Sequence, residues 1–109
     1  MNDCSVLLYR ARTLIVKHGW ARGVLRDDIN RRCILGALHD AAGETKLALT
    51  GDEVAKASLA ILVAIKTYYQ SPLIMEDQII SSWNDKVCGG KHEAISLFDS
   101  AIAIAEQRN

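Results

Sequence analysis

Proline and aromatic residues are scarce in this chain of 109 residues. A single proline, Pro72, leaves long stretches of the chain free to form helices. Aromatic residues account for only 6% of the chain, whereas 50% of its residues are apolar. This apolar share excludes a disordered chain, and Leu, Ile, Val and Ala must fill most of the core. The length is that of one domain, residues 1–109, without room for a second core.

Cysteines are also few, and their odd number matches no disulfide framework. We therefore expect a reducing, cytoplasmic location. The N-terminal residues lack the basic and apolar regions of a signal peptide. The most apolar stretch, Val54 to Ile65, contains Lys56 and is shorter than the roughly 20 residues that span a bilayer. We expect no contact with membranes.

Net charge is absent as well, because 13 basic residues balance 13 acidic ones. The distribution is uneven: residues 1–40 hold seven basic and four acidic side chains, which gives +3 there and −3 in the rest. Six of the seven arginines lie in this first part. Arginine suits forked contacts with carboxylates or phosphates, but a neutral domain lacks the basic character of a dedicated nucleic-acid binder.

What the sequence does contain is apolar residues at helical spacing. We expect helices over about 3–18, 31–42, 51–69 and 91–107, and a helix or short helical turns over 73–83. The segment 51–69 is apolar on nearly every side, which is typical of a central helix packed around most of its circumference. The predicted fold is an all-α, compact bundle of four to five helices around this central apolar helix.

Several residues set the expected boundaries and contacts of these helices. Gly19 is expected to form the C-cap of the first helix, and Gly43 to end the second. Thr50 and Glu53 have the spacing of a capping box, which places a helix start at about residue 51. Gly36 costs helix propensity inside the second helix, so a close approach by a neighbouring backbone would explain it. Between the first two helices, the side chains of Val24 and Leu25 are expected to be buried in the core.

The last helix is expected to bury one apolar stripe. We place Ala94, Ile95, Phe98, Ala101, Ile102 and Ala105 on its inner side. Leu97 and Ile104 then fall outside this stripe, and their exposure would permit a homo-oligomer.

Three segments together carry a resemblance to a known family. They are Cys33-Ile34-Leu35-Gly36-Ala37-Leu38, then Trp83-Asn84-Asp85, then Leu97-Phe98-Asp99 with Ala101-Ile102. This set resembles a small uncharacterised bacterial and bacteriophage family with a W-C-x-x-G-A-L helix, a W-N-D turn and an L-F-D-x-A-I helix. The sequence departs from that pattern at Arg32, where the family usually has tryptophan. The resemblance implies a helical fold and a bacterial or phage setting, and it implies no activity.

The most conspicuous polar cluster is Trp83-Asn84-Asp85. An aromatic ring beside two hydrogen-bonding side chains could form the wall of a ligand site. The alternative is structural: Asn and Asp in a turn before a helix bind exposed backbone amides, and Trp83 anchors the corner in the core.

The sequence offers only weak metal or catalytic sets. Cys88 and His92 are four residues apart, but no second pair at metal-ligand spacing accompanies them. Cys33, His39 and Asp40 contain the residue types of a nucleophilic set, but Cys33 and His39 are turned to different helix faces. We therefore expect no cofactor, no metal and no catalytic residue.

The remaining candidate is a group of arginines before the second helix: Arg22, Arg26, Arg31 and Arg32. They either contact a partner or form a solvated surface paired with Asp27 and Asp28. We predict a non-enzymatic interaction protein that binds a macromolecule, a protein rather than a nucleic acid, through this N-terminal face. The alternative prediction is a small-molecule or metal-binding domain, with or without enzyme activity, around Trp83-Asn84-Asp85.

Overall fold

The computed structural model of the protein describes residues 2–44, 51–69 and 79–107. These residues form five α-helices and one π-helical turn, and among them no strand longer than an isolated bridge occurs. In chain order the elements are α1 (Asp3–His18), α2 (Ile34–Glu44), α3 (Gly51–Ala64), η1 (Ile65–Tyr69), α4 (Ile79–Lys86) and α5 (Lys91–Gln107). The predicted all-α bundle is confirmed.

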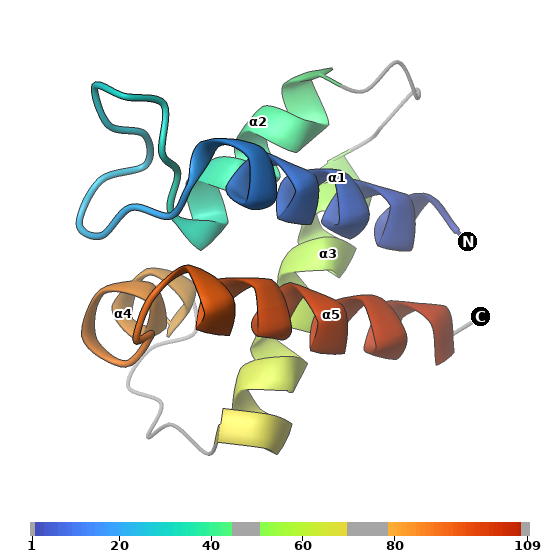
Figure 1. The fold of residues 1–109 in the computed structure, drawn as a ribbon. Coiled ribbons are helices and arrows are strands. Elements are labelled where there is room, and N and C mark those ends of the chain that lie inside the picture. Colours follow the sequence, from blue (N-terminus) through green and yellow to red (C-terminus); the bar gives the residue numbers. More distant parts are fainter. Residues whose placement is uncertain (1, 45–50, 70–78, 108–109) are drawn as a thin grey trace.

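Helices α1 and α5 lie side by side and run in opposite directions, and α3 crosses behind both of them (Figure 1). Helix α3 also contacts α2 and α4, so it touches every other α-helix of the bundle. The N-terminus of α1 and the C-terminus of α5 share one end of the molecule. At this end the Asn2 side-chain amide donates to the Ala105 carbonyl over 3.0 Å.

Both ends of α1 follow from local chemistry. Asn2 and Ser5 form a capping box, in which the Ser5 amide donates to Asn2 Oδ1 (2.7 Å) and the Asn2 amide donates to Ser5 Oγ (3.0 Å). At the other end Gly19 has φ +103°, and its amide donates to the Ile15 carbonyl. This left-handed region favours glycine, and the predicted C-cap is confirmed.

The core lies where α1, α3 and α5 meet and extends to α2 and α4. Its largest fully buried apolar side chains are Leu7, Leu8, Ile15, Ile34, Leu38, Ile61, Ile65, Trp83, Leu97 and Phe98. On α3 the small residues Ala57, Ala60 and Ala64 are buried between them, so the neighbouring helices can approach closely. Burying each large apolar side chain stabilises the fold by roughly 1.5–3 kcal/mol.

The central helix is less enclosed than we predicted. Its start at Gly51 is confirmed, whereas Thr50 of the predicted capping box lies outside the described residues. One face of α3 is buried, but Leu59 on another face is 46% exposed, and Leu62 and Val63 are only partly buried. The expectation of burial around most of the circumference was wrong, because the described helices pack mainly on one side of α3.

The predicted exposure of Leu97 and Ile104 was also wrong. Their exposed fractions are 0% and 9%, whereas Ile95 and Ile102 are only partly buried at the edge of the core. Two apolar stripes overlap on α5, and its position against α1 and α3 selects the one that contains Leu97 and Ile104. These two residues therefore offer no exposed surface for a homo-oligomer.

Several helix boundaries differ from the prediction. Helix α2 begins at Ile34 instead of residue 31, because the backbones of Arg31 and Arg32 bond to the preceding loop, and it passes through Gly43 to Glu44. Trp83-Asn84-Asp85 lies within α4 and not in a turn. The turn follows at 87–90, where the Cys88 amide bonds back to the Trp83 carbonyl.

Helix α4 covers part of the ambiguous segment. It begins at Ile79, and its residues Ile80 and Trp83 are buried. The prediction for residues 73–78 lies outside the described residues.

Candidate interaction surface

The segment Gly19–Cys33 joins α1 to α2 and projects from the end of the molecule opposite both termini (Figure 1). Its two limbs are held together by backbone hydrogen bonds. The Ala21 amide donates to the Arg32 carbonyl (3.0 Å), and the Arg32 amide donates to the Gly19 carbonyl (3.1 Å). Further out, the Asp27 amide donates to the Arg31 carbonyl (2.9 Å). We call Gly19–Cys33 the projecting loop, and these bonds make it hairpin-like.

The projecting loop is seated on α2 through Gly36. A Cβ atom at this position would lie 2.8 Å from the Leu25 carbonyl carbon and closer still to its oxygen, well inside van der Waals contact. The same Leu25 oxygen accepts a hydrogen bond from the Cys33 amide (3.2 Å). The predicted close approach of a backbone to Gly36 is confirmed, and the approaching backbone is that of Leu25.

The projecting loop is attached to α4 by the side chain of Asn84, which is 0% exposed. Its oxygen accepts from Trp20 Nε1 (2.8 Å) and from the Ile34 amide (3.1 Å). Its nitrogen donates to the Ala21 carbonyl (3.1 Å) and to Asp85 Oδ1 (2.9 Å). Because a buried amide needs partners for both groups, Asn84 fixes the base of the loop and the first turn of α2 together.

Residues next to Asn84 add further attachments. Asp85 Oδ1 accepts from the Gly23 amide (2.8 Å). The Arg22 guanidinium donates to the Cys88 carbonyl (2.9 Å) and lies 5.1 Å from the centre of the Trp20 ring. These contacts hold Arg22 against the protein while its side chain keeps an exposed surface.

Arg32 lies inside this assembly and not on its surface. It is 4% exposed, its Nε bonds to Asp40 Oδ2 (2.7 Å), and its Nη1 donates to the Asn30 carbonyl (2.7 Å). A buried guanidinium of this kind is paired for structural reasons. The placement of Arg32 on the accessible arginine-rich face was therefore wrong, whereas Arg22, Arg26 and Arg31 are exposed there.

The tip of the projecting loop, residues 26–31, is organised by Asp27. Asp27 Oδ1 accepts from the amides of Ile29 (3.1 Å) and Arg31 (2.8 Å), and Oδ2 pairs with Arg31 Nε (2.6 Å). Burial raises the pKa of Asp27, but the hydrogen bonds from Arg31 and Ile29 outweigh it, so the pKa lies below the usual 3.8. Asn30 takes φ +69° in this turn and accepts a hydrogen bond from Arg26 (3.0 Å).

Apolar side chains are exposed on this ordered scaffold. Val24 is 48%, Leu25 53% and Ile29 67% exposed, so the expectation that Val24 and Leu25 plug the core was wrong. The Leu25 backbone contacts α2 at Gly36. A hollow of about 380 Å³ lies at the tip and is lined by Val24, Arg26, Asp27, Asp28, Ile29 and Arg31. Ile29 was not predicted as a site residue; its only sequence signal was an apolar side chain among polar and charged ones.

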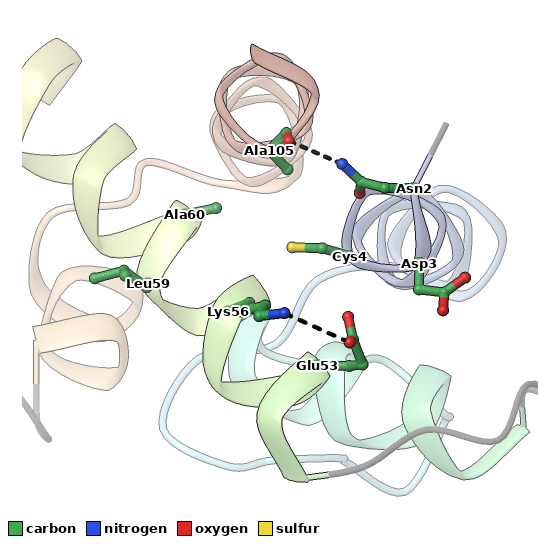
Figure 2. Close-up of a pocket in the computed structure, with 8 residues that line it drawn as sticks. All are labelled: Asn2, Asp3, Cys4, Glu53, Lys56, Leu59, Ala60 and Ala105. Atoms are coloured by element: carbon green, nitrogen blue, oxygen red, sulfur yellow. Dashed lines mark hydrogen bonds and ion pairs between the residues drawn. The ribbon is translucent and has the colours of Figure 1, made fainter. Parts of the chain in front are cut away.

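A second hollow, of about 420 Å³, lies near the opposite end of the molecule. Figure 2 shows its lining, which comes from the start of α1, one side of α3 and the end of α5. The lining residues are Asn2, Asp3, Cys4, Glu53, Lys56, Leu59, Ala60 and Ala105. Glu53 and Lys56 are 3.7 Å apart, and with Asp3 they give the lining a formal charge of −1.

The other predicted site residues are not brought into one site. Trp83 is 2% exposed, and neither it nor Asn84 or Asp85 lines either of the two hollows. The described part of the chain contains no group of three or more side chains able to hold a metal ion. Cys88 is buried and His92 is exposed.

The cysteines are buried and form no disulfide. Burial raises the pKa of Cys33 and of Cys88, so both thiols stay protonated at neutral pH. Cys33 is buried and lies before α2, which begins at Ile34, whereas His39 is exposed on that helix, so the two do not share one helix as predicted.

Comparison with models of protein families shows a match over most of the chain. The model of a family of unknown function (DUF6197) matches residues 2–104. Neither a curated protein nor a solved structure matches the chain. Within the described segments, every helix is too short or too polar to cross a membrane. The resemblance to an uncharacterised family is thus confirmed, and the chain belongs to the family of unknown function DUF6197.

Proposed function

We propose that this protein is a non-enzymatic, protein-binding module, and that the projecting loop contacts an acidic surface of its partner. The observation that carries this proposal is a contrast within the loop. The side chains of Val24, Leu25 and Ile29 are exposed, whereas the backbone that carries them is tied to α4 by the fully buried Asn84.

A loop held in this way binds with little loss of conformational freedom. Ordering a flexible loop on binding costs about 0.5–1.5 kcal/mol for each immobilised side chain, and an ordered loop avoids much of that cost. Exposed apolar side chains on an ordered segment are typical of binding surfaces. Arg22 and Arg26 add forked donors beside them, which suit carboxylates of a partner.

The charges of the loop favour a protein over a nucleic acid. Four arginines are offset by Asp27 and Asp28, and Asp27 neutralises Arg31 directly. Phosphate binding relies on several unopposed cations, whereas protein interfaces combine apolar anchors with a few arginines. The raised thiol pKa of Cys33 and Cys88 also supports a role other than nucleophilic catalysis.

The setting of this function is part of the proposal. Buried cysteines without disulfides support a cytoplasmic location. The family resemblance in the helix around Gly36 and in the last helix supports a bacterial or bacteriophage origin.

Affinity capture with two matched variants tests the proposal. The loop variant combines Arg26→Glu with Ile29→Ser, and the control combines Arg10→Glu with Tyr9→Ser on the exposed side of α1. We expect a protein that is captured by the wild type and the control and is lost by the loop variant, with similar melting temperatures for all three. Equal capture by the loop variant would contradict the proposal.

A further inference from the structure

We propose that the protein assembles head to tail, with the Ile29 tip of one copy seated in the hollow beside Leu59 of the next. This inference rests on the proposed function, because it names a second copy as a partner of the projecting loop. It is carried by three observations: the positions of the two surfaces, their apolar residues and their charges.

The two surfaces lie at opposite ends of the molecule. The projecting loop follows the C-terminal end of α1, and the hollow is lined by Asp3 at its N-terminal end (Figure 1). Helix α5 returns alongside α1, so Ala105 also lies at the end with the hollow. A contact between unlike surfaces on opposite ends is heterologous, which leaves one tip and one hollow open at the ends of each chain of copies.

The tip offers an exposed apolar side chain, and the hollow offers apolar residues in its lining. Ile29 stands out from the tip and is 67% exposed, more than any other large apolar side chain of the described residues. The hollow of about 420 Å³ has the size in which proteins hold small ligands. Leu59, which is 46% exposed, and Ala60 are the apolar residues that α3 contributes to its lining. Seating Ile29 there would cover both Ile29 and Leu59.

The charges of the two surfaces are opposite in sign. On the accessible surface of the projecting loop, Arg22, Arg26 and Arg31 outnumber Asp27 and Asp28, which gives a formal charge of +1, and the lining of the hollow carries −1. At the tip, Arg31 is paired with Asp27, but Arg26 donates only to the uncharged Asn30 within the described residues. Asp3 is exposed at the hollow and can face Arg26 of another copy.

Sedimentation velocity on the purified full chain, from micromolar to millimolar concentration at low salt, tests this assembly. We expect the average mass to rise with concentration and to fall when salt screens the charges. Ile29→Asp replaces the apolar side chain of the tip by a carboxylate, and Leu59→Asp does the same in the lining of the hollow. Each substitution should weaken association by about tenfold or more. Val16→Asp, at an exposed position of α1 outside both surfaces, should assemble like the wild type.

Mixing the two inactive variants identifies the geometry of the contact. The intact tip of Leu59→Asp fits the intact hollow of Ile29→Asp, so the mixture should form pairs and nothing larger. Assembly by Leu59→Asp alone, or no pairing in the mixture, would overturn the head-to-tail contact. A wild type that stays monomeric at every concentration would also overturn it, whereas loop-dependent capture of another protein would leave the proposed function standing.

Discussion

Replacing Gly36 by alanine tests how the projecting loop is seated on α2. The new Cβ atom would lie 2.8 Å from the Leu25 carbonyl carbon, and the contact is with backbone and not with a flexible side chain. The Leu25 backbone cannot simply turn away, because its carbonyl also accepts the Cys33 amide. Relief requires the loop to move away from α2 as a unit.

The expected change in the free energy of unfolding is the sum of two costs and one gain. Overpacking of a filled site costs about 1–3 kcal/mol. Loss of the hydrogen bond from the Cys33 amide to the Leu25 carbonyl costs about 1 kcal/mol more. Alanine returns about 1 kcal/mol of helix propensity. We expect Gly36→Ala to lower the free energy of unfolding by about 1–3 kcal/mol, and each kcal/mol lowers Tm by about 4–8 °C in a domain of this size.

Gly43→Ala is the matched control, because it changes the same residue type in the same helix. Among the described residues, a Cβ atom at Gly43 would meet nothing within 4 Å apart from its chain neighbours and the backbone of its own helix. This variant should be as stable as the wild type or up to about 1 kcal/mol more stable. Thermal and urea unfolding followed by circular dichroism measure both variants. The reasoning is refuted if Gly36→Ala is as stable as Gly43→Ala.

Three further predictions concern other residues of the site. Asn84→Ala leaves the Trp20 ring nitrogen and the Ile34 amide without their acceptor, so urea unfolding should show a loss of about 2–4 kcal/mol; an unchanged midpoint would contradict the role of Asn84. Because the pKa of Asp27 is lower in the folded protein, its carboxylate stabilises the fold above pH 3.8 and this contribution is lost as the pH falls through the folded pKa. The stability difference between wild type and Asp27→Asn should therefore shrink on acidification, and a difference that is independent of pH would disprove it. The buried thiols of Cys33 and Cys88 should react with Ellman's reagent only as fast as the protein opens, and fast reaction in the native state would show that they are accessible.

The helices could be predicted from the sequence because their signals are local. The apolar spacing of 3–18 and the glycine at 19 lie within a few turns of each other, and both ends of α1 are as predicted. Gly36 was informative for a related reason. A glycine inside a helix lowers its stability, so a contact with another part of the chain must require it. At Gly36 that contact is the Leu25 backbone, which leaves no room for a Cβ atom.

The surface of the loop could not be predicted in the same way, because burial depends on residues distant in sequence. Arg32 is buried because Asp40, on the next helix, pairs with it. Leu97 is buried because α5 is rotated to face α1 and α3, and its two overlapping stripes look equally suitable in the sequence. The role of Asn84 required the loop and α4 to be adjacent, although 63 residues separate Ala21 from Asn84.

The central claim is that the projecting loop is exposed but held in one conformation. Amide hydrogen exchange measured residue by residue tests it most directly. The Ala21 amide donates to the Arg32 carbonyl, the Arg32 amide to the Gly19 carbonyl and the Ile34 amide to the Asn84 side chain. These three amides should therefore be protected from exchange in the wild type. In Asn84→Ala this protection should fall while that of α1 and α5 persists. Exchange of these three amides at the rate of an unfolded chain in the wild type would contradict the claim.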